Sequence, residues 1–439
     1  MIGQLILSLS ILIILHEMGH FLPAKAFNTR VEKFYLFFDP YFSLFKKQIG
    51  ETEYGIGWLP LGGYVKISGM VDESFDTEQL KQEPQPWEFR SKPAWQRLII
   101  MLGGVTVNFL LGFFIFAMVL FAWGEEYLPA ENVKYGIHVD SIGMQMGLKN
   151  GDKITKIGNK PFEKFSDRQV VRAIVIDNIK TLTVDRNGRE QVLQVDPSMI
   201  KELSSYKNKN KLLFTERVPF VIGDFLKKSP AKDAGLEKGD SLIAVNGDPL
   251  VFFDEYQARL RSAPNEDLEL TVVREGEVKN FPMTTTDNGM IGVRPYGPGY
   301  FFETQRQEFT FLESLPAGTV KGVNFLSDQI KAFGHILSGR IAASESLGGF
   351  ASIGSMFGKE WNWERFWTMT AILSLILAFM NLLPIPALDG GHVLFLLGEV
   401  ITGRKPSDKF MEYATMVGFI LIVGLMLYAN GLDVIRGCN

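Results

Sequence analysis

The chain contains 439 residues, with a formal net charge of −4 and an isoelectric point near 5.9. Its charges are spread along the chain and form no basic stripe or tail, so the composition gives no indication of a nucleic-acid partner. The only cysteine, Cys438, lies next to the C-terminus, which excludes an intrachain disulfide.

Four apolar stretches of the sequence are long enough to cross a membrane as helices. They cover residues 1–26, 98–124, 366–388 and 413–432, and about 20 apolar residues suffice to span the hydrocarbon core of a bilayer. The first stretch lacks the basic leader and the small-residue cleavage site of a signal peptide, so we expect it to stay in place as a membrane helix. The sequence therefore predicts a multi-pass α-helical membrane protein with four transmembrane helices.

The first stretch contains the sequence His16-Glu17-Met18-Gly19-His20. On a helix, His16 and His20 lie on one face about one turn apart, so both imidazoles can reach a single metal ion. Glu17 stands beside the first histidine, where a carboxylate can accept a proton from a water molecule at the metal. Polar residues are costly inside a membrane helix and usually mark a function, although polar pairing between helices is the alternative. We therefore predict a zinc site here.

Residues 27–97 are predicted to form a membrane-associated region that contains a β-hairpin. Residues 53–59 and 64–67 have the composition of strands, and Pro60-Leu61-Gly62-Gly63 between them has the composition of a turn. The residues alone are equally compatible with an ordinary surface hairpin.

An internal repeat follows the second apolar stretch. Residues 146–154, Met-Gly-Leu-Lys-Asn-Gly-Asp-Lys-Ile, recur at 234–242 as Ala-Gly-Leu-Glu-Lys-Gly-Asp-Ser-Leu. Each copy continues into a helix-like stretch and a strand pair, with turns at Asn187-Gly188 and Glu275-Gly276. This pattern resembles the PDZ domain, and we predict two tandem β-rich PDZ domains over residues 125–213 and 214–300. Because PDZ domains add a peptide to a sheet edge, an extended peptide or a trimmed C-terminus is a candidate partner.

An amphipathic helix is expected in the linker 301–365, either packed on the repeats or lying on the membrane surface, with lipid as its partner. Its apolar residues recur every three or four positions: Val320, Val323, Leu326, Ile330, Phe333 and Leu337.

The third apolar stretch ends in Pro384 and Pro386, which deny a helix its usual backbone hydrogen bonds, so the chain must open there. Unwound backbone at membrane depth is tolerated where it is buried in protein or lines a wet cavity. Asp389 follows at once and is the predicted third ligand, since catalytic zinc usually has three protein ligands and one open position.

His392 is a rival for that third position. The two remaining histidines, His138 in the first repeat and His335 on the amphipathic helix, are expected to be incidental.

The distribution of basic residues predicts the topology. Segment 25–97 contains ten Lys and Arg residues, and three more lie in the predicted loop 389–412. The positive-inside tendency places both segments in the cytoplasm and the repeats in the periplasm of a bacterial inner membrane. His16 follows roughly 21 Å of helix, which puts the site near the cytoplasmic side. Residues 433–439 are predicted to form a short tail.

Two motifs together resemble the site-2 protease family of intramembrane zinc metalloproteases. They are the His-Glu-x-x-His sequence of the first membrane helix and Asn-x-x-Pro-x-Pro-x-Leu-Asp-Gly at 381–390. The two PDZ repeats between the second and third helices make the chain similar to the bacterial sigma-E regulators of that family, over nearly its whole length. The resemblance implies that His16, His20 and Asp389 hold Zn²⁺ and that Glu17 is the general base.

The same resemblance implies substrate-binding residues. Asn381 corresponds to a motif asparagine that helps to hold the substrate strand, and Asn108 lies in a Gly-x-x-x-Asn element of the second helix. The hairpin corresponds to one that dips into the membrane and pairs with the substrate; its candidate residues are Gly57, Trp58, Leu59, Gly62, Gly63 and Tyr64. The implied substrates are single-pass membrane proteins with trimmed outer domains, such as an anti-sigma factor, and leftover signal peptides.

Two other functions are compatible with parts of the sequence. A metal transporter would also place ionisable residues in membrane helices, but it would need further buried carboxylates, and the interiors of the second and fourth stretches are uncharged. A PDZ scaffold with an inactive membrane anchor would have no use for the metal-binding pattern.

Overall fold

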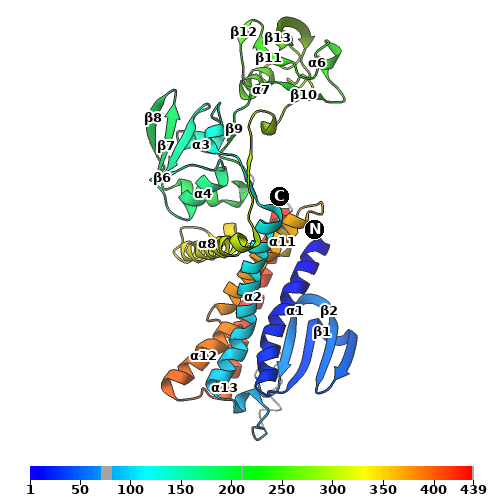
Figure 1. Ribbon diagram of the computed structural model, residues 1–439, viewed down its shortest axis with the longest axis vertical. Coiled ribbons are helices and arrows are strands. Elements are labelled where there is room, and N and C mark those ends of the chain that lie inside the picture. The colour runs from blue at the N-terminus through cyan, green and yellow to red at the C-terminus, as the bar shows by residue number, and fades with distance from the viewer. Residues whose placement is uncertain (71–81, 209–210, 438–439) are drawn as a thin grey trace. The chain divides into compact units, whose positions relative to one another are not determined.

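The computed structural model describes residues 1–70, 82–208 and 211–437 of the chain (Figure 1). Cys438 and part of the predicted membrane-associated region, residues 71–81, lie outside the described residues. The described chain forms two compact units. The first contains Met1–Gly124, Glu308–Ile330 and Leu347–Asn439, and the second contains Glu125–Gln307 and Lys331–Ser346.

Helices dominate the first unit. They are α1 (Ile2–Ala26), α2 (Ala94–Trp123), α8 (Phe311–Leu337, of which the last turns belong to the second unit), α10 (Phe350–Met356), α11 (Trp363–Leu382), α12 (Asp389–Thr402) and α13 (Asp408–Gly437). Among the described residues, α1, α2, α11 and α13 are long and apolar enough to cross a membrane, which confirms the four predicted spans. The start of α1 and the end of α13 lie at the same end of this unit (Figure 1), as an even number of crossings requires.

Helices α1 and α2 touch at a pair of glycines. A Cβ atom on Gly103 would lie 1.9 Å from the carbonyl oxygen of Gly19, and one on Gly19 would lie 2.5 Å from the carbonyl oxygen of Gly103. Only glycine permits this approach, which is how membrane helices commonly pack. The contact occurs at the histidine motif of α1, because a Cβ on Gly104 would meet His20 Nε2 at 2.3 Å.

The chain opens after α11, as the two prolines predict. Helix α11 ends at Leu382, Ala387 has a φ of 90°, and Asp389 begins α12. Residues 389–402 are therefore a helix and not part of the predicted loop 389–412. Gly390 and Gly391 allow this sharp reversal, since a Cβ on either would overlap carbonyl groups of the preceding loop. The third predicted span is correspondingly shorter than 366–388.

The sheet of the first unit differs from the predicted hairpin. It contains two long bent strands, β1 (Val31–Ile49) and β2 (Thr52–Ile67). Residues 31–36 of β1 pair with 63–67 of β2 on one side and with 53–56 on the other. The two segments predicted to pair with each other are therefore both strands, but they are separated by the strand 31–36. The prediction missed β1, since its run of aromatic residues lacks the alternation of a half-buried strand.

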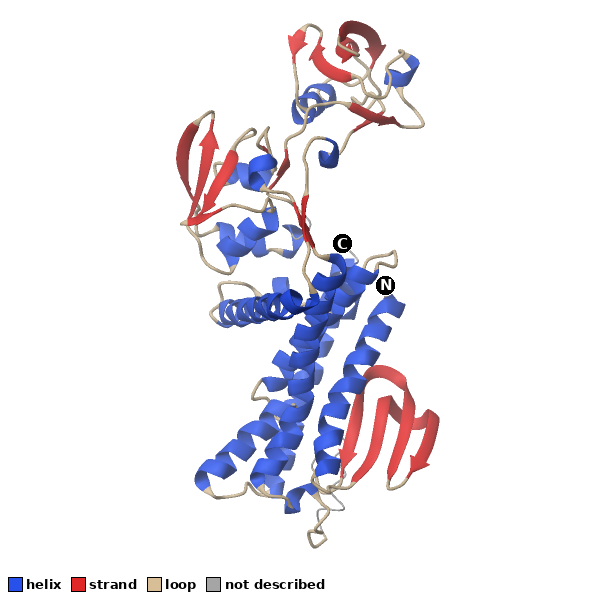
Figure 2. Cartoon of the chain, in the orientation of Figure 1, coloured by secondary structure: helices blue, strands red, loops and turns tan. Residues whose placement is uncertain are grey.

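The second unit contains two β-rich halves (Figures 1 and 2). Their four-stranded sheets have the same strand order, β6-β5-β7-β8 and β12-β11-β13-β14. The strands are β3 (Glu125–Tyr127), β4 (Ile137–Val139), β5 (Lys153–Ile157), β6 (Lys160–Pro161), β7 (Thr181–Arg186), β8 (Arg189–Gln194), β9 (Phe214–Glu216), β10 (Ile222–Phe225), β11 (Ser241–Val245), β12 (Asp248–Pro249), β13 (Asp267–Arg274), β14 (Glu277–Thr284), β15 (Val293–Pro295) and β16 (Gln305–Gln307). The helices are α3 (Ser141–Gln145), α4 (Asp167–Val175), α5 (Met199–Ser204), α6 (Pro230–Asp233), α7 (Phe253–Arg261) and α9 (Ala343–Ser346).

The repeated Gly-Asp motif has the same structural role in both halves. Asp152 is buried and accepts hydrogen bonds from Arg186 Nε and Nη2, each at 2.7 Å. Asp240 accepts the equivalent bonds from Arg274 at 2.7 and 2.6 Å. Each arginine thus joins the end of a hairpin strand to the motif loop.

The predicted boundary between the halves, at residues 213 and 214, is wrong. Strand β9, which starts at Phe214, pairs with β4, and Phe214 is buried in the core of the first half. The strand β15 closes the second half against β10 in the same way. The boundary therefore lies after β9, because each half needs its last strand to complete the core.

The predicted amphipathic helix is α8. Its buried residues, Ser314, Gly318 and Gly322, are small and recur every four positions, and the two glycines lie against Ala117 and Phe113 of α2. Of its six predicted apolar residues, all but Leu326 are exposed. The apolar residues of α8 are therefore exposed for the most part, and the two alternatives for this helix, packing on the repeats or lying on the membrane surface, stay predictions.

Candidate metal centre

Three predicted ligands meet although they come from distant parts of the chain. His16 Nε2 lies 3.3 Å from His20 Nε2, and Asp389 Oδ2 lies 3.4 and 3.3 Å from these two nitrogens. The helix α1 supplies both histidines, and the opened chain after α11 delivers Asp389 as the first residue of α12. Both histidines are buried.

The geometry of this cluster fits a zinc ion. The buried Asp389 Oδ2 accepts no hydrogen bond, even though two imidazole nitrogens surround it. Four ligands about 2.0–2.1 Å from a tetrahedral zinc lie roughly 3.3–3.4 Å from one another, and the three separations here have that length. The residues can therefore hold zinc in a three-ligand site.

The far sides of both imidazoles are held by the helix α2. His20 Nδ1 lies 2.8 Å from the carbonyl oxygen of Ile100, to which it can donate its proton, so Nε2 is left with a lone pair for a metal. His16 Nδ1 lies 3.1 Å from the Asn108 side-chain amide, and Asn108 Oδ1 is buried without a partner. Reversing this amide would let Oδ1 accept the Nδ1 proton of His16 and free its Nε2 in the same way.

A cavity of about 750 Å³ adjoins the cluster and is lined by Glu17, His16, His20 and Asp389. The carboxylate of Glu17 faces the backbone N–H of Val65, on the strand segment 63–67. That segment pairs with β1 on one side only, so its other edge is open toward the cavity that it lines. The arrangement brings a metal site, a carboxylate and an unpaired strand edge together.

The predicted substrate-binding residues divide into two groups. Asn381, Leu59, Gly62, Gly63 and Tyr64 line the cavity, and Asn381 Nδ2 lies 3.3 Å from His16 Nε2.

The other three predicted residues do not line it. Asn108 is completely buried and faces His16, so its position suits orienting that ligand and not binding a substrate. Gly57 pairs with Ser43, and Trp58 donates to the carbonyl oxygen of Pro40 at 2.9 Å. The separation of residues 53–57 from 63–67 by strand 31–36 explains why part of the predicted hairpin does not line the cavity.

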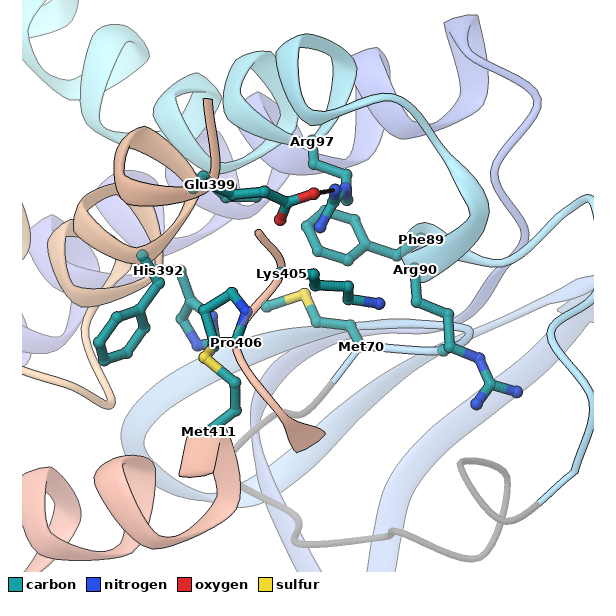
Figure 3. Close-up of a pocket in the computed structure, with 12 residues that line it drawn as sticks. Met70, Phe89, Arg90, Arg97, His392, Glu399, Lys405, Pro406 and Met411 are labelled. Carbon is teal, nitrogen blue, oxygen red and sulfur yellow. Dashed lines mark hydrogen bonds and ion pairs between the residues drawn. The ribbon is translucent and has the colours of Figure 1, made fainter. Parts of the chain in front are cut away.

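The rival ligand His392 lies between two cavities. It lines the large cavity and also a smaller one, of about 60 Å³, in which Arg97 of α2 donates to Glu399 of α12 at 2.5 Å (Figure 3). This ion pair joins α12 to the start of α2. Among the described residues, the cluster of metal-binding atoms within 4.8 Å contains His16, His20 and Asp389 and does not include His392.

Sequence reasoning missed several residues of the cavity wall. Asp39 and Pro40 reach it from the bend of β1, and Thr415 and Phe419 reach it from α13. An aspartate within the aromatic run 34–45 is a signal that could have been noticed. The residues of α13 carry no comparable signal, since their sequence reads as an ordinary membrane helix.

Comparison with known proteins gives a consistent result. A family model described as peptidase family M50 matches residues 4–425. The regulator of sigma-E protease RseP of Salmonella typhimurium is 27% identical over 97% of this chain and 96% of its own. The regulator of sigma E protease of Haemophilus influenzae is 25% identical over 99% of this chain and 98% of its own. A relative from Neisseria meningitidis, whose name includes the words zinc metalloprotease, is 27% identical to this chain over 98% of both chains.

Proposed function

The chain belongs to peptidase family M50 and is a zinc-dependent metalloendopeptidase, and from this premise we propose that it cleaves the transmembrane segments of single-pass membrane proteins. The observation that carries the proposal is the position of the metal cluster: His16 and His20 lie on α1, which is long and apolar enough to span a membrane, and Asp389 follows another such helix, α11. A peptide bond can reach such a site only if it lies in a membrane-embedded segment.

In this proposal His16, His20 and Asp389 hold the zinc ion, and Glu17 is the general base. Bound zinc would act as a Lewis acid toward the scissile carbonyl and a water molecule. Glu17 accepts the proton of that water and delivers it to the leaving amine. Asn108 and the carbonyl of Ile100 keep the two imidazoles oriented toward the metal.

The substrate must be held as an extended chain, because a helix hides its backbone groups from attack. The open edge of residues 63–67 supports this step, since an edge strand pairs with another chain through main-chain hydrogen bonds. Asn381 lines the same cavity next to the metal cluster, and we assign it the role of holding the substrate strand.

The two halves of the second unit are proposed to be PDZ domains. Their shared strand order and their paired Asp-Arg contacts support one common fold. In the proposed role they keep bulky outer domains away from the site, and their proposed ligand is an extended peptide or a trimmed C-terminus.

We place the protein in a bacterial inner membrane, with the repeats in the periplasm and the metal site near the cytoplasmic side. The ten Lys and Arg residues of segment 25–97 support this orientation. The proposed substrates are pre-trimmed anti-sigma factors, in regulated intramembrane proteolysis, and remnant signal peptides. The names of the relatives that regulate sigma-E support the first of these.

The test is cleavage of a tagged single-pass substrate by purified protein in detergent. Wild type should release the fragment, and Glu17→Gln should lower the rate by at least about a hundredfold, as expected for loss of a general base. Equal cleavage by both would refute the mechanism. If a reporter protein fused within the repeats gives a cytoplasmic signal, the proposed orientation is refuted.

A further inference from the structure

The bend of β1 places one carboxylate on the wall of the catalytic cavity. Residues 38–40 line the cavity, and they are flanked by Phe37 and Tyr41, whose φ values of 68° and 75° are unusual for bulky residues. Strand β2 makes room for this bend with glycine. A Cβ on Gly57 would lie 2.1 Å from the carbonyl oxygen of Phe38, and one on Gly62 would lie 2.7 Å from the Phe38 ring.

Hydrogen bonds from two neighbouring strand segments fix this carboxylate. Tyr64 donates its hydroxyl to Asp39 Oδ1, and Ser43 donates to Asp39 Oδ2, both at 2.9 Å. The ring of Tyr64 is itself stacked between Tyr35, at 5.2 Å, and Phe38, at 6.1 Å. Asp39 is therefore held in one orientation before any substrate binds.

Asp39 has no cation partner among the residues that the structure describes. The other two carboxylates of the sheet each have a cation partner. Glu32 Oε2 lies 3.5 Å from Lys66 Nζ, and Glu53 Oε2 lies 3.9 Å from Lys46 Nζ. A carboxylate can accept about four hydrogen bonds, so the two that Asp39 receives leave capacity on both oxygens. A charge that faces an apolar membrane environment is costly until an opposite charge meets it.

From these contacts we propose that Asp39 is a specificity-determining residue, which binds a Lys or Arg side chain of the substrate segment. The inference rests on the proposed function, because it needs a substrate strand along residues 63–67. It also predicts where the basic residue lies. Gly63 packs against Ile13 of α1, and Val65 faces Glu17. Relative to the metal site, Tyr64, which holds Asp39, is therefore displaced toward the amino-terminal half of α1. We expect the basic residue of the substrate to lie a few positions from the scissile bond, on the side that faces this half of α1.

The experiment uses the full chain in detergent and a model single-pass substrate. Lysine is placed at one position at a time on either side of the scissile bond, and methionine at the same position serves as an uncharged side chain of similar length. The ratio of kcat/KM for the lysine and methionine substrates is measured for wild type and Asp39→Asn. We expect a ratio of roughly ten at one position in wild type, as for a close charge pair, and a ratio near one in the variant.

Glu53→Gln is the matched control. Glu53 belongs to the same hydrogen-bonded group through Tyr35, at 2.8 Å, but it does not line the cavity, so the variant should keep the wild-type ratio. Asp39→Lys is the second variant, and it should prefer glutamate over methionine at the position where wild type prefers lysine.

A ratio near one at every position in wild type would overturn the proposal, and so would a preference that survives in Asp39→Asn. A glutamine substrate that is cleaved as fast as the lysine substrate would show that charge is not recognised. These outcomes are distinct from failure of the proposed function, in which wild type and Glu17→Gln would treat all substrates alike.

Discussion

Asp389 Oδ2 lies 3.3 Å from His20 Nε2, yet this buried oxygen accepts no hydrogen bond. Two groups that would normally share a proton are instead placed at a separation that suits two ligands of one tetrahedral zinc ion. The contact joins the first transmembrane helix to the segment after the third, so the metal site depends on the assembled helices and not on the α1 motif alone.

Replacing Asp389 with alanine should remove most of the bound zinc. Two histidines on one helix remain, but a protein site with two ligands binds zinc far more weakly than one with three. We expect the zinc content, measured by atomic absorption after purification, to fall from about one ion per chain to roughly a tenth of that. His392→Ala is the matched control and should retain zinc; the reverse pattern would make His392 the third ligand.

Replacing Gly104 with alanine should also lower zinc content, although Gly104 is not a ligand. Its new Cβ would lie 2.3 Å from His20 Nε2 and 2.7 Å from His16 Cε1, so both imidazoles would have to move. The measurement is again zinc per chain, together with cleavage rate.

A suitable control for Gly104→Ala is Gly424→Ala, on the membrane helix α13. No atom lies within 4 Å of the Cβ position of Gly424, so this variant should bind zinc normally. Full zinc content in Gly104→Ala would contradict this prediction. It would show that α1 and α2 can separate without cost, although Gly19 and Gly103 are in direct backbone contact.

The sequence predicted the parts of the site that obey local rules. The spacing of His16 and His20 on a helix, and the opening of the chain at Pro384 and Pro386, follow from backbone geometry alone. Asp389 could be named because it directly follows that opening. The structure brings these residues together as expected.

The predictions that failed concern pairing and boundaries. Residues 53–57 and 63–67 have the composition of strands, but composition does not tell which strand lies between them, and the aromatic run of β1 gave no alternating pattern. Phe214 was assigned to the wrong half because a terminal strand is recognised by its partner, β4, and not by its own sequence. The substrate role of Asn108 stays a prediction, and its burial against His16 could not be read from the sequence.

Replacing Arg186 with methionine should destabilise the first half of the second unit. Asp152, whose side chain is 1% exposed, would lose its cation partner, and losing one member of such a buried pair costs about 3 kcal/mol. Hydrogen exchange of the β5 and β7 amides in the full chain measures this opening free energy. Arg274→Met should have the same effect on β11 and β13, because Asp240 is held in the same way.

The control for Arg186→Met is Lys156→Met on the same sheet. The side chains of Lys156 and its partner Glu190 are 48% and 62% exposed, so their ion pair should contribute less than about 1 kcal/mol. Equal protection of β5 in both variants and wild type would mean that the repeated Asp-Arg contact is not needed for the fold.

The start of α7 should make the stability of the second half depend on pH. Burial alone would raise the pKa of Glu255, but hydrogen bonds from the backbone N–H groups of Phe252 and Val251 and the nearby Arg217 hold this pKa below its ordinary value. A carboxyl group whose pKa is lower in the folded state stabilises the fold fully above its unfolded pKa, which is about 4.3. That contribution is lost as the pH falls through the folded pKa.

Glu255→Gln should therefore lower the melting temperature of the second unit at pH 7, by roughly 2–4 °C, since the charged carboxylate caps the helix and pairs with Arg217. The difference from wild type should shrink as the pH is lowered below about 4.3, because protonation removes the same charge from wild type. Calorimetry of both proteins at pH 7 and at progressively lower pH tests this. Glu277→Gln, at a side chain that is 74% exposed, is the control and should match wild type throughout. A difference for Glu255→Gln that stays constant with pH would show that the carboxylate acts through its shape and not its charge.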